Sequence, residues 1–145
     1  MHRHAGGFTL IELMTVVVII AVLAAIAIST YGSYITRSKI QSAKSDLSAL
    51  ALNLENEFQR ELQYSAHATS STAQTQAAYQ GWRPAEGKDF VYTVASASTT
   101  YTLTATGIDG PLASCVLTLP SANVQQRIDP NTIGSVSGCG SVTTW

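Results

Sequence analysis

Glu12 carries the strongest chemical signal in this sequence, because it is a carboxylate inside an otherwise apolar run. The run Phe8–Ile28 reads FTLIELMTVVVIIAVLAAIAI, and its other polar residues are Thr9 and Thr15. An acid at the centre of a membrane helix costs about 2.5–3.5 kcal/mol, so a carboxylate at such a position is a functional candidate. The alternative is an acid at a membrane edge that reaches toward the headgroups.

Cys115 and Cys139 are the next candidate residues, and they are the two cysteines of the chain. In an oxidising compartment the simplest arrangement is a disulfide between them. Closing a loop of about 25 residues stabilises the fold by roughly 3.5 kcal/mol in the loop-entropy treatment. The alternative is two unrelated buried thiols.

Other residue patterns that support catalysis or metal binding are absent from the sequence. There is no glycine-rich phosphate loop, no Ser-His-Asp set and no His/Cys/Asp cluster at metal spacing. His67 is expected to be solvated, and Asp129 with Asn131 offers too few acidic oxygens for calcium. Three acids look like a solvated or partner-facing helix edge: Glu55, Glu57 and Glu61. We therefore expect no enzyme activity, no cofactor and no metal.

The charge of the chain is low and nearly balanced. Eight Lys and Arg oppose nine Asp and Glu, and charged residues make up 12% of the 145 residues. After Gln63 there are three cations and four anions, so the sequence has no basic stripe that would neutralise a phosphate backbone. This composition argues against direct nucleic acid binding and fits an exported or closely packed protein.

The apolar run must form the element that positions Glu12. As a helix, Phe8–Ile28 would be about 31 Å long, enough to cross a bilayer core. Residues 1–7 form a short leader. Two processing routes remain open at this point. A signal peptidase could cut after Ala27, because Ala25-Ile26-Ala27 has the small-x-small form, or a cut after Gly7 could leave the run in the mature protein.

The segment Gly7–Leu13, GFTLIEL, resembles the processing motif of type IV pilins and of the related pseudopilins of type II secretion. The resemblance implies that a prepilin peptidase cuts between Gly7 and Phe8, and that Phe8 is then N-methylated. It also implies a role for Glu12, whose carboxylate would meet the positively charged amine of Phe8 from its own or a neighbouring subunit. Opposite charges attract strongly in a low-dielectric bundle.

Two features depart from the usual pattern. Family members commonly have Gly in mid-helix and Pro near its outer end, where this chain has Ala21 and Ser29. A straighter helix is therefore expected, because Gly and Pro weaken or kink helices. Three cations follow the run (Arg37, Lys39 and Lys44) and one, Arg3, precedes it. A Lys/Arg count alone would place the wrong end in the cytoplasm, and we let the motif decide for a cytoplasmic leader.

Helical periodicity continues through residues 29–64. An apolar stripe recurs at steps of three and four: Ile40, Ala43, Leu47, Leu50, Leu54, Phe58 and Leu62. Polar residues are expected to fill the other face: Lys44, Asp46, Asn53, Glu55, Gln59 and Arg60. Such a stripe is normally covered by the rest of the chain.

The period then changes to two, after an irregular connection. Residues 65–89 read as a long loop with a short helical turn near Thr75–Tyr79, pinned to the core by Tyr79 and Trp82. Three strands are expected in residues 90–145: Phe90–Val94, Thr100–Thr106 and Cys115–Leu119, with a weak fourth near Val124–Ile128. The prediction is an α+β fold in which a long N-terminal helix packs against a 3–4-stranded antiparallel sheet, with a disulfide-bounded C-terminal region.

The resemblance predicts a structural subunit of a type IV pilus, with the minor-pilin branch favoured on residues 90–119. Its partners would be copies of itself, other pilins, the prepilin peptidase and an inner-membrane assembly platform. It would span the bacterial inner membrane once, with its N-terminus in the cytoplasm, and then enter an extracellular filament used for adhesion, twitching motility or DNA uptake. The alternatives are a type II secretion pseudopilin, a DNA-binding competence pilin, and a secreted domain cut after Ala27.

Overall fold

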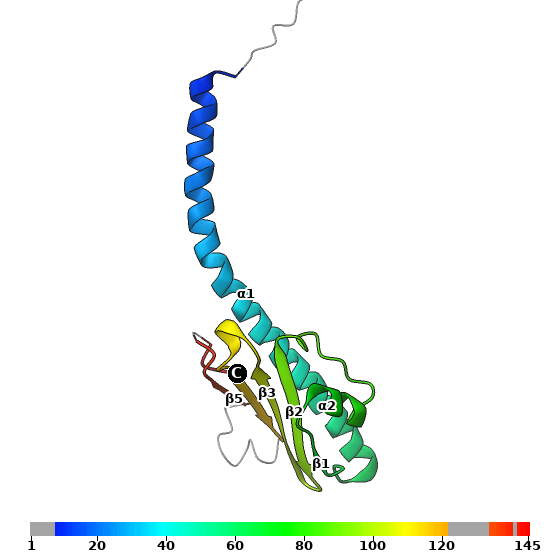
Figure 1. The fold of residues 1–145 in the computed structure, drawn as a ribbon. Coiled ribbons are helices and arrows are strands. Elements are labelled where there is room, and N and C mark those ends of the chain that lie inside the picture. Colours follow the sequence, from blue (N-terminus) through cyan, green and yellow to red (C-terminus); the bar gives the residue numbers. More distant parts are fainter. Residues whose placement is uncertain (1–7, 122–133, 141) are drawn as a thin grey trace, which may run out of the picture. The chain divides into compact units, whose positions relative to one another are not determined.

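The computed structural model describes residues 8–121, 134–140 and 142–145, and these residues form an α+β fold (Figure 1). Helix α1, Leu10–Glu61, contributes to two compact units, residues 1–35 and residues 36–145. The second unit adds a sheet and a short second helix, α2, Thr72–Ala78. The predicted fold class is confirmed.

In the first unit, the apolar part of α1 is exposed along its length. Exposed fractions of its large apolar side chains run from 46% at Val16 to 78% at Leu10. This part of the helix is long and apolar enough to cross a membrane. Its surface therefore needs a covering other than water.

In the second unit, the apolar stripe of α1 forms one side of the core. Five of its residues are fully buried: Ile40, Ala43, Leu47, Leu50 and Leu54. Phe58 is half-buried against this cluster. Leu62 is 79% exposed and was wrongly placed in the stripe, because the helix ends at Glu61 and Leu62 adopts a positive φ of 56°.

The sheet is an antiparallel meander whose described strands follow the chain, in the order β1-β2-β3-β4-β5. Its strands are β1 (His67–Ala68), β2 (Phe90–Ala97), β3 (Thr100–Gly107), β4 (Val116–Pro120) and β5 (Ser135–Ser137). The three predicted strands correspond to β2, β3 and β4. The predicted strand number was too low, because β1 and β5 are too short to show an alternating pattern. The weak strand near Val124–Ile128 lies outside the described residues.

The two faces of the sheet differ in chemistry. The inner face buries apolar side chains against α1: Tyr92, Val94, Leu103, Ala105, Leu117 and Leu119. On the outer face, the register places Thr93 opposite Thr104, and Thr104 opposite Thr118. Along these strands, apolar side chains and threonines therefore alternate between the inner and the outer face of the sheet, as predicted.

The connection between α1 and β2 is more ordered than predicted. Helix α2 begins at an N-cap, where the Ser71 hydroxyl accepts a hydrogen bond from the Gln74 N–H. Thr75 is fully buried and its hydroxyl lies 2.8 Å from the Tyr92 carbonyl oxygen, to which it donates. Tyr79 and Trp82 are both buried, as predicted.

Asp46 joins three parts of the second unit, although it was wrongly assigned to the solvated face of α1. Its side chain is 8% exposed. The carboxylate accepts hydrogen bonds from the Tyr92 hydroxyl at 2.7 Å and from the backbone N–H groups of Ala85 and Glu86 at 3.0 and 3.1 Å. Its carbonyl accepts from the Trp82 indole. Periodicity cannot separate such a residue from a solvated neighbour.

Lys44 and Glu55 are two more polar residues of α1 that were wrongly assigned to solvent. Lys44 is 7% exposed, donates to the Thr144 carbonyl at 2.7 Å, and has its pKa lowered by burial. Glu55 is half-buried and accepts from the hydroxyls of Tyr64 and Tyr101. Burial, followed by the Glu55 charge, raises the pKa of Tyr64 to about 12.

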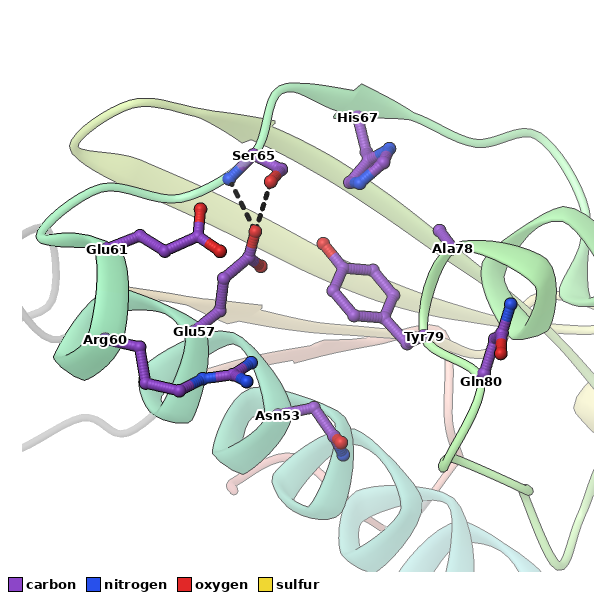
Figure 2. A pocket seen from close by; sticks show the side chains of 9 residues that line it. All are labelled: Asn53, Glu57, Arg60, Glu61, Ser65, His67, Ala78, Tyr79 and Gln80. Carbon is purple, nitrogen blue, oxygen red and sulfur yellow. Dashed lines mark hydrogen bonds between the residues drawn. The ribbon is translucent and has the colours of Figure 1, made fainter.

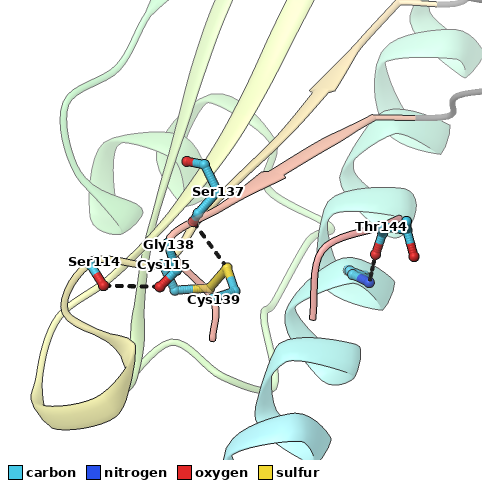
Figure 3. The surroundings of a disulfide bond; sticks show 7 residues. Ser114, Cys115, Ser137, Gly138, Cys139 and Thr144 are labelled. Carbon is cyan, nitrogen blue, oxygen red and sulfur yellow. Dashed lines mark hydrogen bonds between the residues drawn. A yellow bond between two sulfur atoms is a disulfide. The ribbon is translucent and has the colours of Figure 1, made fainter. Parts of the chain in front are cut away.

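A disulfide between Cys115 and Cys139 connects the start of β4 to the chain after β5, as predicted (Figure 3). Between them, Gly138 has a φ of +66°, and its carbonyl accepts a hydrogen bond from the Ser114 hydroxyl. A Cβ at Gly138 would lie 1.9 Å from the Ser114 carbonyl oxygen, so only glycine fits. Trp145 packs on the core and lies 6.0 Å from the Lys44 ammonium.

We predict that replacing both cysteines by serine, Cys115→Ser with Cys139→Ser, lowers the free energy of unfolding by roughly 3.5 kcal/mol. The bond joins two residues with a sequence separation of 24. Its loss raises the conformational entropy of the unfolded chain. Urea unfolding of the full chain in detergent measures this. The matched control is Ser114→Ala, which keeps the disulfide and should cost far less. Equal stability of the double variant and the parent would contradict the prediction.

Candidate functional site

The candidate site is the exposed apolar segment of α1 with Glu12 in its first turn. No Pro or Gly interrupts residues 8–28, and the run is rich in Val, Ile, Leu and Ala. Such a segment is stable as a helix in an apolar environment, where its backbone groups must be bonded internally. The fold therefore presents Glu12 on a rigid element.

The polar groups around Glu12 are satisfied within the helix. The Thr9 hydroxyl accepts a hydrogen bond from the Glu12 N–H at 3.3 Å, and the Thr15 hydroxyl donates to the Glu12 carbonyl at 2.9 Å. Among the described residues, an ion pair joins Lys39 to Asp89 at 2.6 Å. Within the same residues, no cation pairs with the Glu12 carboxylate. The Glu12 carboxylate is thus the polar group of the segment that could pair with a cation from another subunit.

A shallow apolar hollow of about 350 Å³ lies on the surface of this helical segment. It is lined by Ile11, Met14, Thr15, Val18 and Ile19. Side chains three and four positions apart form the ridges and grooves with which helices pack against each other. This apolar hollow is therefore a groove into which the ridge of another helix can pack.

The structure separates the predicted site residues into two groups. Phe8 lies two residues before the start of α1 and four positions before Glu12, while Gly7 lies outside the described residues. Cys115 and Cys139 belong to the second unit, where their disulfide connects the tail to the start of β4. Sequence reasoning missed the structural roles of Asp46, Lys44 and Glu55. The one available hint was that each of the three lies next to a stripe residue in the sequence.

Two family models match the chain, and together they cover most of it. Residues 2–28 match the prokaryotic N-terminal methylation motif. Residues 29–119, more than half of the chain, match the family described as type IV minor pilin ComP, DNA uptake sequence receptor. The chain belongs to this type IV pilin family. The resemblance in Gly7–Leu13 is thereby confirmed.

Curated relatives of this pilin carry pilus names. It is 39% identical over 92 residues to the type IV major pilin protein PilA of Myxococcus xanthus, which covers 63% of this chain and 38% of the relative. It is 54% identical over 50 residues to a fimbrial protein of Pseudomonas aeruginosa, covering 34% and 32% of the two chains. A major fimbrial protein, FimA of Dichelobacter nodosus, is 51% identical over 49 residues, covering 34% and 31%.

The aligned part spans about a third of the length of these relatives. No solved structure gives a significant match to the chain. The relatives therefore support membership of the family. Because the match covers only part of each relative, it does not assign their functions to this chain.

Proposed function

We propose that this chain is a structural subunit of a type IV pilus that assembles through its N-terminal helix. The observation that carries the proposal is the exposed apolar segment with its one carboxylate, on a chain that belongs to the pilin family. Residues 36–145 bury their own core, so the apolar surface of the first unit is left for a membrane and then for other subunits.

The proposed driving force is helix-on-helix packing of the segment Phe8–Ile28. Packing in a filament core would cover side chains such as Leu10, Ile11 and Val18, which are exposed in the single chain. Within that core, Glu12 would meet the Phe8 amine of another subunit and set the axial register. An ion pair of this kind selects one register, because any other leaves a buried charge unpaired.

The proposal includes the maturation and location of the subunit. A prepilin peptidase removes residues 1–7, Phe8 is N-methylated, and an inner-membrane platform receives the subunit with its N-terminus in the cytoplasm. After assembly the subunit lies in an extracellular filament. The match to the methylation motif over residues 2–28 supports this route. A type II secretion pseudopilus would use the same N-terminal chemistry, and recovery of the chain in sheared surface filaments favours the pilus.

We predict that the mature protein begins at Phe8 and carries one methyl group on its amine. Intact mass spectrometry of the membrane-extracted or filament-derived protein measures this directly. Gly7→Val is the test variant: it should keep the leader, because a bulky residue replaces glycine at the cut. The control is Gly6→Ala, one residue further from the cut. A mature chain starting at Ile28 would instead mean signal peptidase processing and would end the filament proposal.

We predict that Glu12→Ala reduces incorporation into filaments by more than about tenfold. Removing one member of a buried ion pair leaves the other charge unpaired, at a cost of about 3–5 kcal/mol. Immunoblots of sheared filaments against whole-cell subunit levels give the measurement. The matched control is Glu61→Ala, which removes an exposed acid from the same helix outside the apolar segment. Normal incorporation of the Glu12 variant would remove the register role.

A second candidate function is DNA binding during uptake, and the family description favours it. The model that matches residues 29–119 is described as a DNA uptake sequence receptor. Against it stand the three cations and four anions after Gln63. In the described part of that region, the exposed cations are Arg83 and Lys88, both in the connection between α2 and β2. A DNA contact would therefore centre on this connection.

If DNA binds there, a gel shift with the full chain in detergent will show a complex that weakens with salt. Arg83→Gln with Lys88→Gln should lower the slope of log affinity against log salt by roughly 1 to 2, since each phosphate contact contributes about 0.9. Arg37→Gln, an exposed cation on α1, is the control and should change nothing. Absence of any shift at about 50 mM salt would argue against direct binding by this subunit.

A further inference from the structure

The polar pocket of the second unit is occupied with its own side chains. It is lined by residues of α1, of α2 and of the chain around β1 (Figure 2). The Glu57 carboxylate there accepts hydrogen bonds from the backbone N–H and the hydroxyl of Ser65. The His67 ring meets the Tyr79 ring edge-on, with centroids 5.5 Å apart, so the histidine that was predicted to be solvated is half-buried instead. Two tyrosines of the first unit, Tyr31 and Tyr34, are in contrast largely exposed.

The apolar stretch that follows Glu12 is shorter than a bilayer core. It runs over sixteen residues, from Leu13 to Ile28, and the hydroxyl of its one polar residue, Thr15, bonds back to the Glu12 carbonyl. As a helix these residues span about 24 Å, whereas the hydrocarbon core is about 30 Å thick. A helix that is too short for the core draws in residues from one of its ends. Either Glu12 or the turn after Ile28 must therefore enter the hydrocarbon.

Tyr31 and Tyr34, here called the tyrosine pair, occupy the turn after Ile28. They lie three positions apart on α1, so their side chains share a face of the helix, and they are 66% and 69% exposed. Side chains of a helix lean toward its N-terminus, so both rings lean back toward the apolar stretch. A tyrosine combines an apolar ring with a polar hydroxyl, and membrane–water interfaces are enriched in it. This turn therefore enters the membrane boundary more easily than a carboxylate does.

The sequence around the tyrosine pair fits a lipid headgroup layer. Its neighbours are small, Ser29, Thr30, Gly32 and Ser33, so the two rings are the large side chains of the turn. No charged residue lies between Glu12 and Arg37. The first charge after the pair is thus a guanidinium, which pairs well with lipid phosphates. Apolar, aromatic and cationic residues follow one another in the order in which a membrane presents hydrocarbon, interface and phosphate.

The distance from the tyrosine pair to Glu12 matches the membrane thickness. Tyr31 follows Glu12 by nineteen positions, which is about 28 Å along a helix, against a core of about 30 Å. We propose that the tyrosine pair docks in the phospholipid headgroup layer on the outer side of the membrane and thereby holds Glu12 at the inner surface until the subunit enters a filament. The inference rests on the proposed function, because it requires the N-terminal helix to span the membrane.

This arrangement explains how an acid is tolerated in the segment. The Glu12 side chain also leans toward the helix N-terminus, so at the inner surface its carboxylate reaches the headgroups. The cost of burying the charge then arises only on assembly, when the Phe8 amine of another subunit is there to pair with it.

A depth measurement by electron paramagnetic resonance tests the proposal, on the full chain in nanodiscs of phosphatidylethanolamine and phosphatidylglycerol. The label is placed on Leu13→Cys, next to Glu12, because the native cysteines are held in their disulfide. Collision rates with oxygen and with a water-soluble nickel complex give its depth. Tyr31→Ser with Tyr34→Ser should move the label roughly 5 Å, one helical turn, deeper into the hydrocarbon, because the polar turn then leaves the membrane. An unchanged depth would overturn the proposal.

Two control variants make the measurement specific. Tyr31→Trp with Tyr34→Trp should keep the depth of the parent, since tryptophan shares the preference for the interface. Leu52→Ser changes a side chain of the same helix that is 65% exposed in the second unit, and it should also leave the label in place. A deeper label in either control would count against the role of the tyrosine pair.

Co-flotation with vesicles of the same lipids separates this proposal from the proposed function. If the parent chain does not float, no helix spans the bilayer and both are wrong. If it floats but the label depth is independent of the tyrosines, only the docking is wrong. If the tyrosines contact a second subunit instead, the serine variant will lose incorporation into sheared filaments at the label depth of the parent, which also overturns the docking.

Discussion

The buried carboxylate of Asp46 is the interaction on which the second unit depends most. It sits on α1, bonds the Tyr92 hydroxyl in the sheet and caps two backbone N–H groups of the connection before β2. Hydrophobic contact alone would allow the sheet to slide along the apolar stripe, because such contact is non-directional. A buried acid with several fixed donors has one satisfactory position, so it sets the register between helix and sheet.

The sequence was informative wherever a residue's neighbours along the chain decide its environment. Periodicity located α1 and its stripe, alternation located β2, β3 and β4, and the cysteine count with an export signal located the disulfide. The motif at Gly7–Leu13 was informative for a different reason. The family model for the N-terminal methylation motif matches this segment as a linear pattern, so its recognition does not depend on the fold.

The remaining features depend on contacts that are distant along the chain. Lys44 lies on the core side because Thr144, a hundred residues later, provides a carbonyl for it. Glu55 is half-buried because Tyr101 reaches it from β3. The two short strands and α2 form because β2 and its neighbours offer them partners, as when Thr75 bonds the Tyr92 carbonyl. No local pattern in the sequence indicates these partners, so they could not be predicted from it.

The strand order has a consequence for the making of the molecule. Each described strand pairs with the strand before it in the chain, so the sheet can grow by one edge as synthesis proceeds. The apolar stripe of α1 is synthesised first, and it stays exposed until β2, β3 and β4 have been synthesised. Cys139 comes after the last described strand, and its partner Cys115 directly precedes β4. The disulfide can therefore form only after β4 and β5 have been made, because Cys139 follows both strands in the chain.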